Sequence, residues 1–451
     1  MFPNSEYANS MSAKKADLFK KIAQSELCNR CGSCIALGKG KIAFSDKTGK
    51  YLPIVNEALT EDEASLLLQA CSGWSFDFPK FRHQFFADPP SFNVFIGPYH
   101  SLAIGHTNDV EIRHKAASGG ILSAILIYLL EKGMIDGAVV LKMSASEPWL
   151  TQPFIATSRE QILEAAQSKY ILSSVNEILP QIAEFKGSLA YVGLPGQVQS
   201  IRKLQAINHP SVANIKYLFG PFYGNTLHFS SIKSFLRSHG EHDYKQISKL
   251  YFRYGEWPGK MRIEMKNGRV IELPKFHANY LIPFHIVKNS LYCTDLTNEF
   301  TDISGGDAWA PVYEERGKGF SMLIARSAIG KQIIDDMVKK GRLSTWDLTE
   351  DEAIKMHSHG YDLKKRGTFI RLRFRKIMGE PVPQYGYTVQ NFALNRIVME
   401  VLISGLFSVL GTGISRFVVE KLPPAFIGSV FEKARTIWKK STHQIKRSKL
   451  A

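Results

Sequence analysis

Cysteine is scarce in this sequence, and its placement is uneven. Only five cysteines occur in 451 residues, and four of them lie within the first 71 positions. Residues 1–21 are polar and basic and lack the apolar core of a secretory signal. Thiols gathered in one segment without such a signal are typical of a reducing compartment and argue against disulfides. We therefore expect a cytoplasmic protein.

Acidic residues are also few relative to basic ones, and two nucleotide-binding motifs are missing. With 57 Lys and Arg against 41 Asp and Glu, the formal net charge is +16. This excess favours an acidic partner: a redox protein such as ferredoxin, a phosphorylated ligand or an anionic membrane surface. No motif that reads nucleic acid accompanies the charge, so nucleic acid is not expected. Neither G-x-G-x-x-G nor G-x4-G-K-S/T occurs, which excludes a standard Rossmann fingerprint and a P-loop.

The first positive signal is a cysteine motif. Cys28, Cys31 and Cys34 read C-x2-C-G-x-C, so one tight loop can supply three ligands to a 4Fe-4S cluster, and Cys71 is the candidate fourth. Zinc is the alternative because four thiolates also suit it. A zinc ribbon usually has a second C-x2-C pair, however, and this sequence has none. We predict one iron–sulfur cluster on these four cysteines.

The surrounding segment resembles half of a two-cluster bacterial ferredoxin. In such ferredoxins the cysteine after each run ligates the other cluster, and here that position is Gly38. Apolar stretches at 41–44 and 51–55 flank a turn at 46–49, which predicts a short hairpin. We expect a polar leader over residues 1–25 and a one-cluster ferredoxin-like module over residues 26–85.

A second signal is the Ser-Gly-Gly turn at 118–120, which precedes the apolar run 121–130. Gly133 is suited to end that helix and 136–141 reads as a buried strand, so the order is half of an α/β unit. Free N–H groups at a helix start, with glycines that allow close approach, suit a phosphate. Plain packing is the alternative for such a turn. Further strands are expected at 93–97, 101–106, 188–193, 217–222 and 261–265.

Several motifs taken together resemble a known family. In order over residues 26–330 they are C-x2-C-G-x-C, Ala117–Gly120, Glu131–Gly133, Ile135–Gly137, Ser168–Tyr170, Gly193–Val198, Trp257–Gly259, Cys293 and Asp302–Asp307. The chain resembles the coenzyme F420 hydrogenase/dehydrogenase beta-subunit family. The resemblance implies a flavoprotein that moves electrons between iron–sulfur centres and a deazaflavin or another acceptor. It also implies an FAD site, lined by Ser118, Gly119, Gly120, Ser168, Lys169, Tyr170, Pro195, Gly196 and Gln197.

The chain departs from the family pattern at one place. Many members of the family have cysteines at the positions of Gly196 and Ser290, near residues 219–220, and at Cys293, and those four hold a cluster beside the flavin. Of these positions only Cys293 is a cysteine here, and one thiol cannot hold a cube. The resemblance therefore implies that the second cluster is absent and that Cys293 is a buried remnant.

The last hundred residues lie outside the resemblance. Residues 364–376 contain seven Lys and Arg, which predicts a dense cationic patch. Residues 397–414 are apolar apart from Glu400 and small residues, and a basic stretch follows at 433–449. Three interpretations stay open: a core helix pair with a solvated basic face, a membrane-surface segment with cationic flanks, and a spanning helix. The run is short for a span, which needs about 20 apolar residues.

Together these features predict an α/β protein, α+β overall. It has a ferredoxin-like N-terminal module, a flavin-binding α/β core over 90–345 (parts 90–180 and 185–345) and a basic helical C-terminal extension over 350–451. The expected function is an iron–sulfur flavoprotein oxidoreductase that passes electrons between a ferredoxin-type donor, one 4Fe-4S cluster and FAD. The alternatives are the beta subunit of a deazaflavin-linked hydrogenase/dehydrogenase complex, or a non-catalytic membrane-associated partner protein in polysaccharide biosynthesis. We expect it in the cytoplasm, peripheral at the inner face of the membrane.

Overall fold

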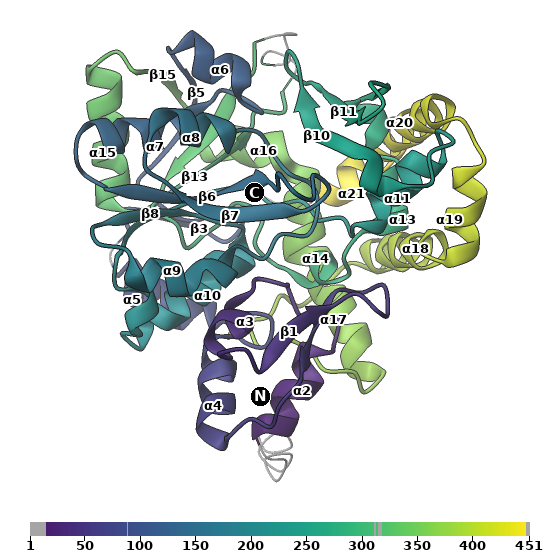
Figure 1. Ribbon diagram of the computed structural model, residues 1–451, viewed down its shortest axis with the longest axis horizontal. Helices are drawn as coiled ribbons and strands as arrows, with labels where there is room; N and C mark the ends of the chain where they lie inside the picture. The colour runs from purple at the N-terminus through teal and green to yellow at the C-terminus, as the bar shows by residue number, and fades with distance from the viewer. Residues whose placement is uncertain (1–14, 88, 311–312, 314–317, 448–451) are drawn as a thin grey trace.

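An eight-stranded mixed sheet forms the centre of the molecule (Figure 1). The computed structural model describes residues 15–87, 89–310, 313 and 318–447. The four central strands β13, β9, β8 and β6 are parallel, and the outer strands pair antiparallel. This arrangement confirms the predicted α/β class. Across the sheet the order is β15 (Leu343–Asp347), β5 (Ser101–Thr107), β14 (Ser321–Ala325), β13 (Ile303–Asp307), β9 (Ile215–Pro221), β8 (Leu189–Val192), β6 (Gly137–Met143) and β7 (Thr151–Ala156).

The parallel strands are apolar on both faces because helices cover both sides of the sheet. In β8, for example, Leu189, Ala190 and Tyr191 are completely buried. Two hydrophobic cores result, one on each side. The first is formed with α7 (Ile121–Glu131), α8 (Arg159–Glu164) and α15 (Ala328–Lys339), and the second with α5 (Phe78–Phe85), α9 (Leu179–Glu184) and α10 (Pro195–Ala206). Short helices connect these elements: α6 (Val110–Lys115), η1 (Val175–Ile178), η2 (Pro210–Val212) and η3 (Tyr244–Gln246).

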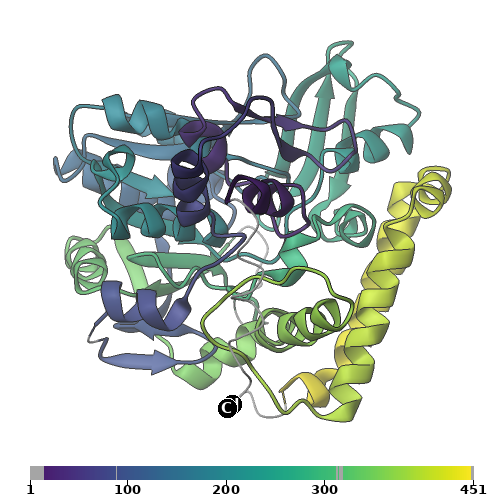
Figure 2. The same cartoon turned by 90° about the horizontal axis from the view of Figure 1, so that it is seen from below.

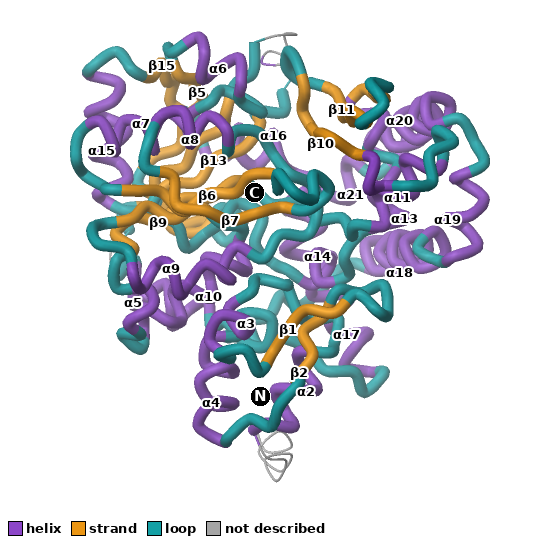
Figure 3. The backbone as a smooth tube through the Cα atoms, in the orientation of Figure 1, coloured by secondary structure: helices purple, strands orange, loops and turns teal. Residues whose placement is uncertain are grey.

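A smaller antiparallel sheet stands beside the large one (Figure 3). It confirms the strand expected at 261–265, and a turn at 266–268 joins that strand to the next. The small sheet and three helices share a third core. Its elements are β10 (Ile247–Tyr254), β11 (Lys260–Met265), β12 (Val270–Pro274), α11 (Ser230–Arg237), α12 (Lys275–Ala278) and α13 (Leu281–His285).

The four clustered cysteines lie in a compact N-terminal part, residues 15–75, called here the cysteine segment. The predicted hairpin is confirmed, with Ile42 opposite Val55 in its ladder. The expected polar leader is helical from Lys15 onward and buries Phe19 and Ile22, whereas residues 1–14 lie outside the described residues. The elements are α2 (Lys15–Ala23), α3 (Ser33–Leu37), β1 (Ile42–Ser45), β2 (Leu52–Val55) and α4 (Glu61–Ala70).

The strand expected at 93–97 is a turn instead. β3 (Ser91–Asn93) pairs with β4 (Gly97–Tyr99), and the residues between them reverse the chain. Asn93 Oδ1 accepts the backbone N–H of Phe95 at 2.9 Å. A short amide side chain that captures its own backbone in this way favours a turn over a strand. The strands expected at 101–106, 188–193 and 217–222 are confirmed as β5, β8 and β9.

The cationic patch expected over 364–376 is largely an internal charge network. Lys364, Lys365 and Arg371 are buried, and Lys365 forms an ion pair with the buried Glu299. Arg371 pairs with Glu400. These cations therefore bind the extension to the core rather than face solvent. The elements involved are α14 (Asn289–Tyr292), α16 (Glu350–Tyr361), a π-helix (Asp362–Gly367) and α17 (Thr368–Ile377).

The chain ends in an outer layer of helices along one edge of the molecule (Figure 2). α18 is not a core helix, since its buried residues are Arg396, Met399 and Glu400. In the described part of the chain no single helix is long and apolar enough to cross a membrane. The pair α18 and α19 meets that test together but is bent by 70°. The layer consists of α18 (Leu394–Leu410), α19 (Gly413–Glu420), α20 (Pro424–Ser441) and α21 (His443–Arg447).

Candidate functional site

A large cavity lies where the parallel strands of the main sheet reach their carboxyl ends. Its volume is about 890 Å³, within the range of about 300–1,000 Å³ that is usual for ligand sites. Gly193, Pro221 and Asp307 mark the ends of β8, β9 and β13 on its wall. The other walls come from the start of α7, from the small sheet with α12 and α13, and from α16 and α20. Ligands of open α/β sheets bind at this edge.

The start of α7 presents backbone N–H groups without a side-chain cap on the cavity wall. Gly120 is the N-cap, with a left-handed φ of 77°, and no side chain caps the helix. Gly120, Ile121 and Ser123 all line the cavity. The first N–H groups of a helix carry partial positive charge and lack intrahelical partners, so they suit a phosphate. The phosphate site predicted at 118–120 therefore has a matching geometry.

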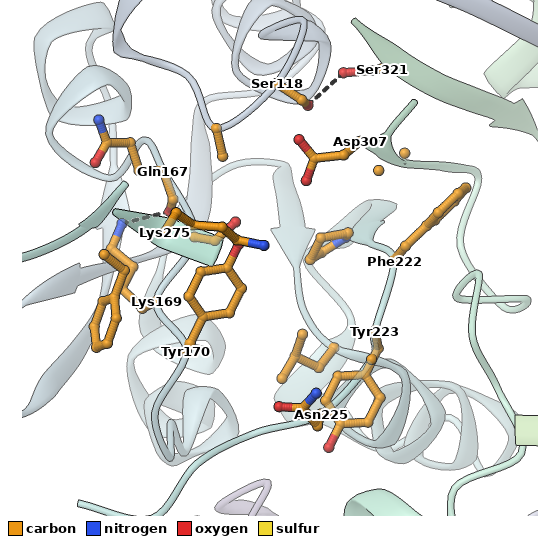
Figure 4. A pocket seen from close by; sticks show the side chains of 18 of the residues that line it. Ser118, Gln167, Lys169, Tyr170, Phe222, Tyr223, Asn225, Lys275, Asp307 and Ser321 are labelled. Atoms are coloured by element: carbon orange, nitrogen blue, oxygen red, sulfur yellow. Dashed lines mark hydrogen bonds between the residues drawn. The ribbon is translucent and has the colours of Figure 1, made fainter. Parts of the chain in front are cut away.

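Gly119 has a different role from the one expected. It does not line the cavity, and an added Cβ would lie 2.5 Å from the Gly105 carbonyl oxygen of β5 and 2.9 Å from the Ser321 nitrogen of β14. Its N–H donates to Ser321 Oγ at 3.0 Å, and Ser118 Oγ lies 2.7 Å from the same oxygen (Figure 4). Gly119 therefore allows the turn to pack on the two strands, and it is Gly120 that faces the ligand space.

Tyr170 sits in a polar cluster on the cavity wall (Figure 4). Arg253 donates to Tyr170 Oη at 2.9 Å and forms an ion pair with Asp307 at 3.1 Å. Trp257 Nε1 donates to Asp307 at 2.9 Å. Burial alone would raise the pKa of Tyr170, but the cations Arg253 and Lys275 outweigh it and hold this pKa below its usual value. The cluster thus presents an acidified phenol in a fixed orientation.

Two other predicted residues line the cavity but hold the protein backbone. Lys169 Nζ donates to the carbonyls of residues 165–167 at 2.5–3.2 Å, which closes the end of α8, and burial lowers its pKa to about 7. Gln197 accepts the N–H of Leu194 at 2.7 Å and donates to the Ser173 carbonyl at 2.8 Å. Both side chains shape the wall rather than offer free groups to a ligand.

The structure brings most of the predicted FAD residues together. Pro195 begins α10 and lines neither of the two cavities described here, and Gly196 lines a second, smaller cavity of about 30 Å³. Cys293 lines that small cavity as well. The residues that line the large cavity as predicted are Ser118, Gly120, Ser168, Lys169, Tyr170 and Gln197.

The small cavity lies where the family pattern would place a second cluster. An added Cβ at Gly196 would lie 2.4 Å from Asn29 Nδ2, and one at Gly220 would lie 1.9 Å from Asn298 Nδ2. Two amides therefore occupy the space that cysteine side chains would need. A volume of 30 Å³ holds about one water molecule rather than an iron–sulfur cube. The half-buried Cys293 is left beside this space.

Three cavity residues were not singled out as site residues in the sequence. Asp307 ends β13, and Lys275 begins α12, with its Nζ 5.8 Å from the ring of Tyr170 and 5.2 Å from that of Trp309. His357 lies at a non-helical kink in α16, and its Nε2 is buried without a hydrogen-bond partner among the described residues. Burial lowers the pKa of His357 to about 4. The Asp302–Asp307 motif marked Asp307, but no local pattern marks the other two.

The loop of the cysteine motif is held in an unusual conformation. Arg30 and Gly32 have φ values of 56° and 96°. A Cβ on Gly32 would lie 2.7 Å from the Glu177 nitrogen, so glycine is needed there for close approach as well as for φ. The buried guanidinium of Arg30 donates to the carbonyls of Lys50 and Tyr51 at 3.0 and 3.3 Å. The loop is thereby fixed to the β1–β2 hairpin.

The thiols of this loop lie close enough to influence one another. Burial raises the pKa of Cys28 to about 12 and also raises those of Cys31 and Cys34, and the charge of Cys71 adds to all three. Thiolates in such a place need a positive metal centre to be stable. Among the described residues no three His, Cys, Asp or Glu side chains converge as for a single metal ion. By their chemistry, four thiolates suit either an iron–sulfur cluster or zinc.

Lys203 of α10 is a buried cation beside the cysteines. Its Nζ donates to the carbonyls of Cys71 and Ser75, both at 2.8 Å. The side chain is only 7% exposed. A positive charge in this position offsets negative charge on thiolate ligands. Nothing in the local sequence marks Lys203, because its partners lie about 130 residues earlier.

Hydrogen bonds join the cysteine segment to residues that lie next in sequence to the lining of the large cavity. Ser72 Oγ donates to the Gly196 carbonyl at 2.5 Å. Asn176 donates its backbone N–H to the Cys31 carbonyl and its side-chain amide to Ser33 Oγ, both at 2.8 Å. The start of α10 thus contacts the cysteine segment through Gly196 and the cavity through Gln197. The two sites are neighbours on a shared wall.

The fold and the site define an α/β protein with a large cavity at the carboxyl edge of its sheet and a cysteine segment bonded to the start of α10 beside that cavity. The chain belongs to the coenzyme F420 hydrogenase/dehydrogenase beta-subunit family. The model of the family's N-terminal region matches residues 103–180, and the model of its C-terminal region matches residues 187–351. The family predicted from the motifs is confirmed.

Known proteins share this core. The coenzyme F420 hydrogenase subunit beta of Methanosarcina barkeri is 29% identical over 57% of this chain and 84% of its own length. The coenzyme F420-dependent sulfite reductase of Methanocaldococcus jannaschii is 24% identical over 77% of this chain but only 52% of its own. A chain in the F420-reducing NiFe hydrogenase complex of Methanosarcina barkeri has the same fold, with a TM-score of 0.52 at 23% identity over 65% of this chain and 99% of that one.

Proposed function

We propose that this chain is the electron-transferring beta-type subunit of a deazaflavin-linked oxidoreductase, and that it holds one 4Fe-4S cluster and FAD. Similar proteins carry the names coenzyme F420 hydrogenase subunit beta and F420-dependent formate dehydrogenase subunit beta, which are subunits of oxidoreductases. The observation that carries the proposal is the shared wall. The cysteine segment is bonded to the start of α10, and Gln197 of that helix lines the large cavity.

The cluster would be held by Cys28, Cys31, Cys34 and Cys71. Interaction with the backbone N–H groups of Arg30 and Ser33 lowers the pKa values of Cys28 and Cys31 against the larger effect of burial. Hydrogen bonds to cluster sulfurs raise reduction potentials by stabilising the more negative state. The loop therefore offers both the ligands and the hydrogen-bond donors that surround them.

FAD would lie in the large cavity, with its phosphates at the start of α7. Bound FAD would supply the exchange between single electrons at the cluster and two-electron transfer to an organic acceptor. The protein's part is to orient the bound groups, to hold protons and to exclude water. Tyr170 holds a proton at its phenolic oxygen under the control of Arg253, and His357 Nε2 offers a hydrogen bond to a ligand. Since the second cluster position is filled, we propose direct transfer between cluster and flavin.

An acidic redox protein would be the electron partner. The net charge of +16 favours ferredoxin or an acidic subunit of a larger complex, through attraction that weakens as salt rises. The deazaflavin F420 is the organic partner suggested by the names of the relatives. Both partners are proposals that the charge and the family support.

The test is to purify the full chain without oxygen and to measure iron, sulfide and flavin. We expect about four irons and one FAD per chain. Cys71→Ser should remove the intact cluster, whereas the matched control Cys293→Ser should leave the iron unchanged. Reduced F420 should bleach the flavin of the wild-type protein. A chain that binds neither iron nor flavin would instead be the non-catalytic partner protein, and eight irons would contradict the single cluster.

A further inference from the structure

In helix α18 the polar side faces the protein and the apolar side faces outward, the reverse of an ordinary surface helix. Its polar residues Arg396, Glu400 and Ser404 recur every four positions and face the body of the protein. There Arg396 pairs with Asp362 and Glu400 at 2.9 Å. A helix on the surface of a soluble domain buries its apolar face and exposes its polar one. Here the outward side is aliphatic, and its exposed large residues are Leu394, Val398, Val401, Leu402, Leu406 and Val409.

The apolar surface continues over the next two helices. Of the 23 large hydrophobic side chains exposed among the described residues, 13 lie between Leu394 and Ile437. Scattered exposed apolar residues are normal, but a gathered set marks a binding surface. Beyond α18 its members are Ile414, Phe417, Val418, Leu422, Phe426, Val430 and Ile437. We call the exposed large hydrophobic residues between Leu394 and Ile437 the apolar face.

The charges around the apolar face are cationic. Residues 394–451 contain ten Lys and Arg but three acidic residues. Two of these acids form ion pairs with arginines, Glu400 with Arg371 and Arg396 and Glu420 with Arg237, and Glu432 lies 3.2 Å from His277 Nε2. Exposed lysines remain beside the apolar residues, namely Lys421, Lys433 and Lys440.

We propose that the apolar face docks on the surface of a lipid bilayer that contains anionic phospholipids, with α18 lying in the plane of the surface. Seventeen residues give α18 a length of about 25 Å, which is shorter than the hydrocarbon core of about 30 Å. The 70° bend after α18 also prevents a continuous span. Apolar residues flanked by lysine are the pattern of interfacial helices, whose cations attract anionic lipids.

The composition of the face favours lipid over a protein partner. Protein interfaces are enriched in Tyr, Trp, Phe, Met and Arg. Of these the apolar face contains Phe417 and Phe426, and the exposed side of α18 presents Leu and Val. The face lies on the part of the chain that follows residue 351, where the family matches end. The proposal is independent of the proposed redox function, because it requires neither cofactor.

The experiment is sedimentation of the full chain with vesicles. One set contains phosphatidylcholine and phosphatidylglycerol in equal parts, and the other contains phosphatidylcholine alone. The test variant is Leu402→Glu with Leu406→Glu, whose side chains are 59% and 54% exposed, so folding does not depend on them. The matched control is Val110→Glu with Val270→Glu, which adds the same charge at exposed sites elsewhere. Circular dichroism and the thermal midpoint verify that all three proteins are folded.

We expect the wild-type protein and the control to bind the anionic vesicles, and the test variant to bind at least about tenfold more weakly, because carboxylates oppose entry into the apolar layer. Replacing Lys421, Lys433 and Lys440 by Gln should weaken binding at low salt and matter less at high salt. Equal binding of test and control variants, or no binding of the wild-type protein, would overturn the proposal. So would a wild-type dimer without vesicle binding that becomes a monomer in the test variant, since the occupant would then be a second copy.

Discussion

Replacing Lys203 with methionine should lower the reduction potential of the proposed cluster. The ammonium is buried and donates to the carbonyls of Cys71 and Ser75, both at 2.8 Å. A nearby positive charge stabilises the reduced and therefore more negative state of a redox centre. Methionine keeps the length and volume of the side chain but removes the charge, so the change is mainly electrostatic.

The magnitude follows from Coulomb's law. A unit charge about 5 to 10 Å from a redox centre contributes about 1.7 to 3.3 kcal/mol at an effective dielectric constant of about 20. For transfer of one electron this equals about 70 to 140 mV. Main-chain carbonyls that lose a donor also cost stability, about 1 to 3 kcal/mol if they stay buried. The potential shift and the loss of stability are separate readouts.

The assay is a redox titration of the anaerobic protein, followed by electron paramagnetic resonance. Lys203→Arg keeps the charge and should retain most of the potential. Lys186→Met removes an exposed lysine outside the cysteine segment and serves as the matched control. An unchanged potential in Lys203→Met at full iron content would refute the electrostatic argument. A shift of equal size in Lys186→Met would mean that net charge, rather than the buried position, is responsible.

Three further predictions concern the cavity and the stability of the fold. Ser123→Trp, which fills the cavity beside the start of α7, should expel FAD and leave the iron content unchanged, whereas Ser146→Trp on an exposed loop should keep both. Burial lowers the pKa of His285 to about 3, so below about pH 6.5 the unfolded chain takes up a proton that the folded one refuses. By itself His285 should lower the free energy of unfolding in urea by about 1 kcal/mol per pH unit between pH 6.5 and pH 5, and His285→Gln should reduce the measured slope by that amount; an equal slope in both proteins would contradict the assignment. Glu400→Ala leaves Arg371 with an unpaired buried charge and should cost about 3 to 5 kcal/mol in the same assay, so a loss below about 1 kcal/mol would count against the buried network.

Local features of the fold were predictable because local signals determine them. The hairpin around the turn 46–49 follows from turn residues between two apolar stretches, and the helix after Gly120 follows from an apolar run with glycine at each end. The turn at Asn93 was missed because its strand-like neighbours, Val94 and Phe95, outweigh one capping amide in the pattern. The α/β class follows from strand and helix patterns that alternate along the chain, and these patterns are visible in the sequence.

The parts of the site that depend on distant partners were not predictable. The sequence predicts that Lys365 is a surface charge. In the structure it pairs with Glu299, which lies 66 positions earlier in the chain. The roles of Arg253 and Lys203 could not be predicted for the same reason, since each contacts segments far away in the sequence. Gly119 was predicted to line the FAD site because it belongs to the Ser-Gly-Gly turn. In the structure its lack of a side chain allows the turn to pack on β5 and β14. Motifs located the cavity wall, but three-dimensional contacts decide which groups remain available to a ligand.

The wall that α16 and α20 give to the large cavity has a consequence for how this family diversifies. Those helices lie essentially beyond residue 351, whereas the start of α7 and Tyr170 lie within the matched core. One wall of the cavity and the proposed FAD-binding residues are therefore encoded in separate stretches of the gene. A relative with the same core and a different tail would admit molecules of another size or charge without any change in its cofactor residues. If the core transfers electrons as proposed, exchange of the tail is a simple route by which it would acquire new acceptors.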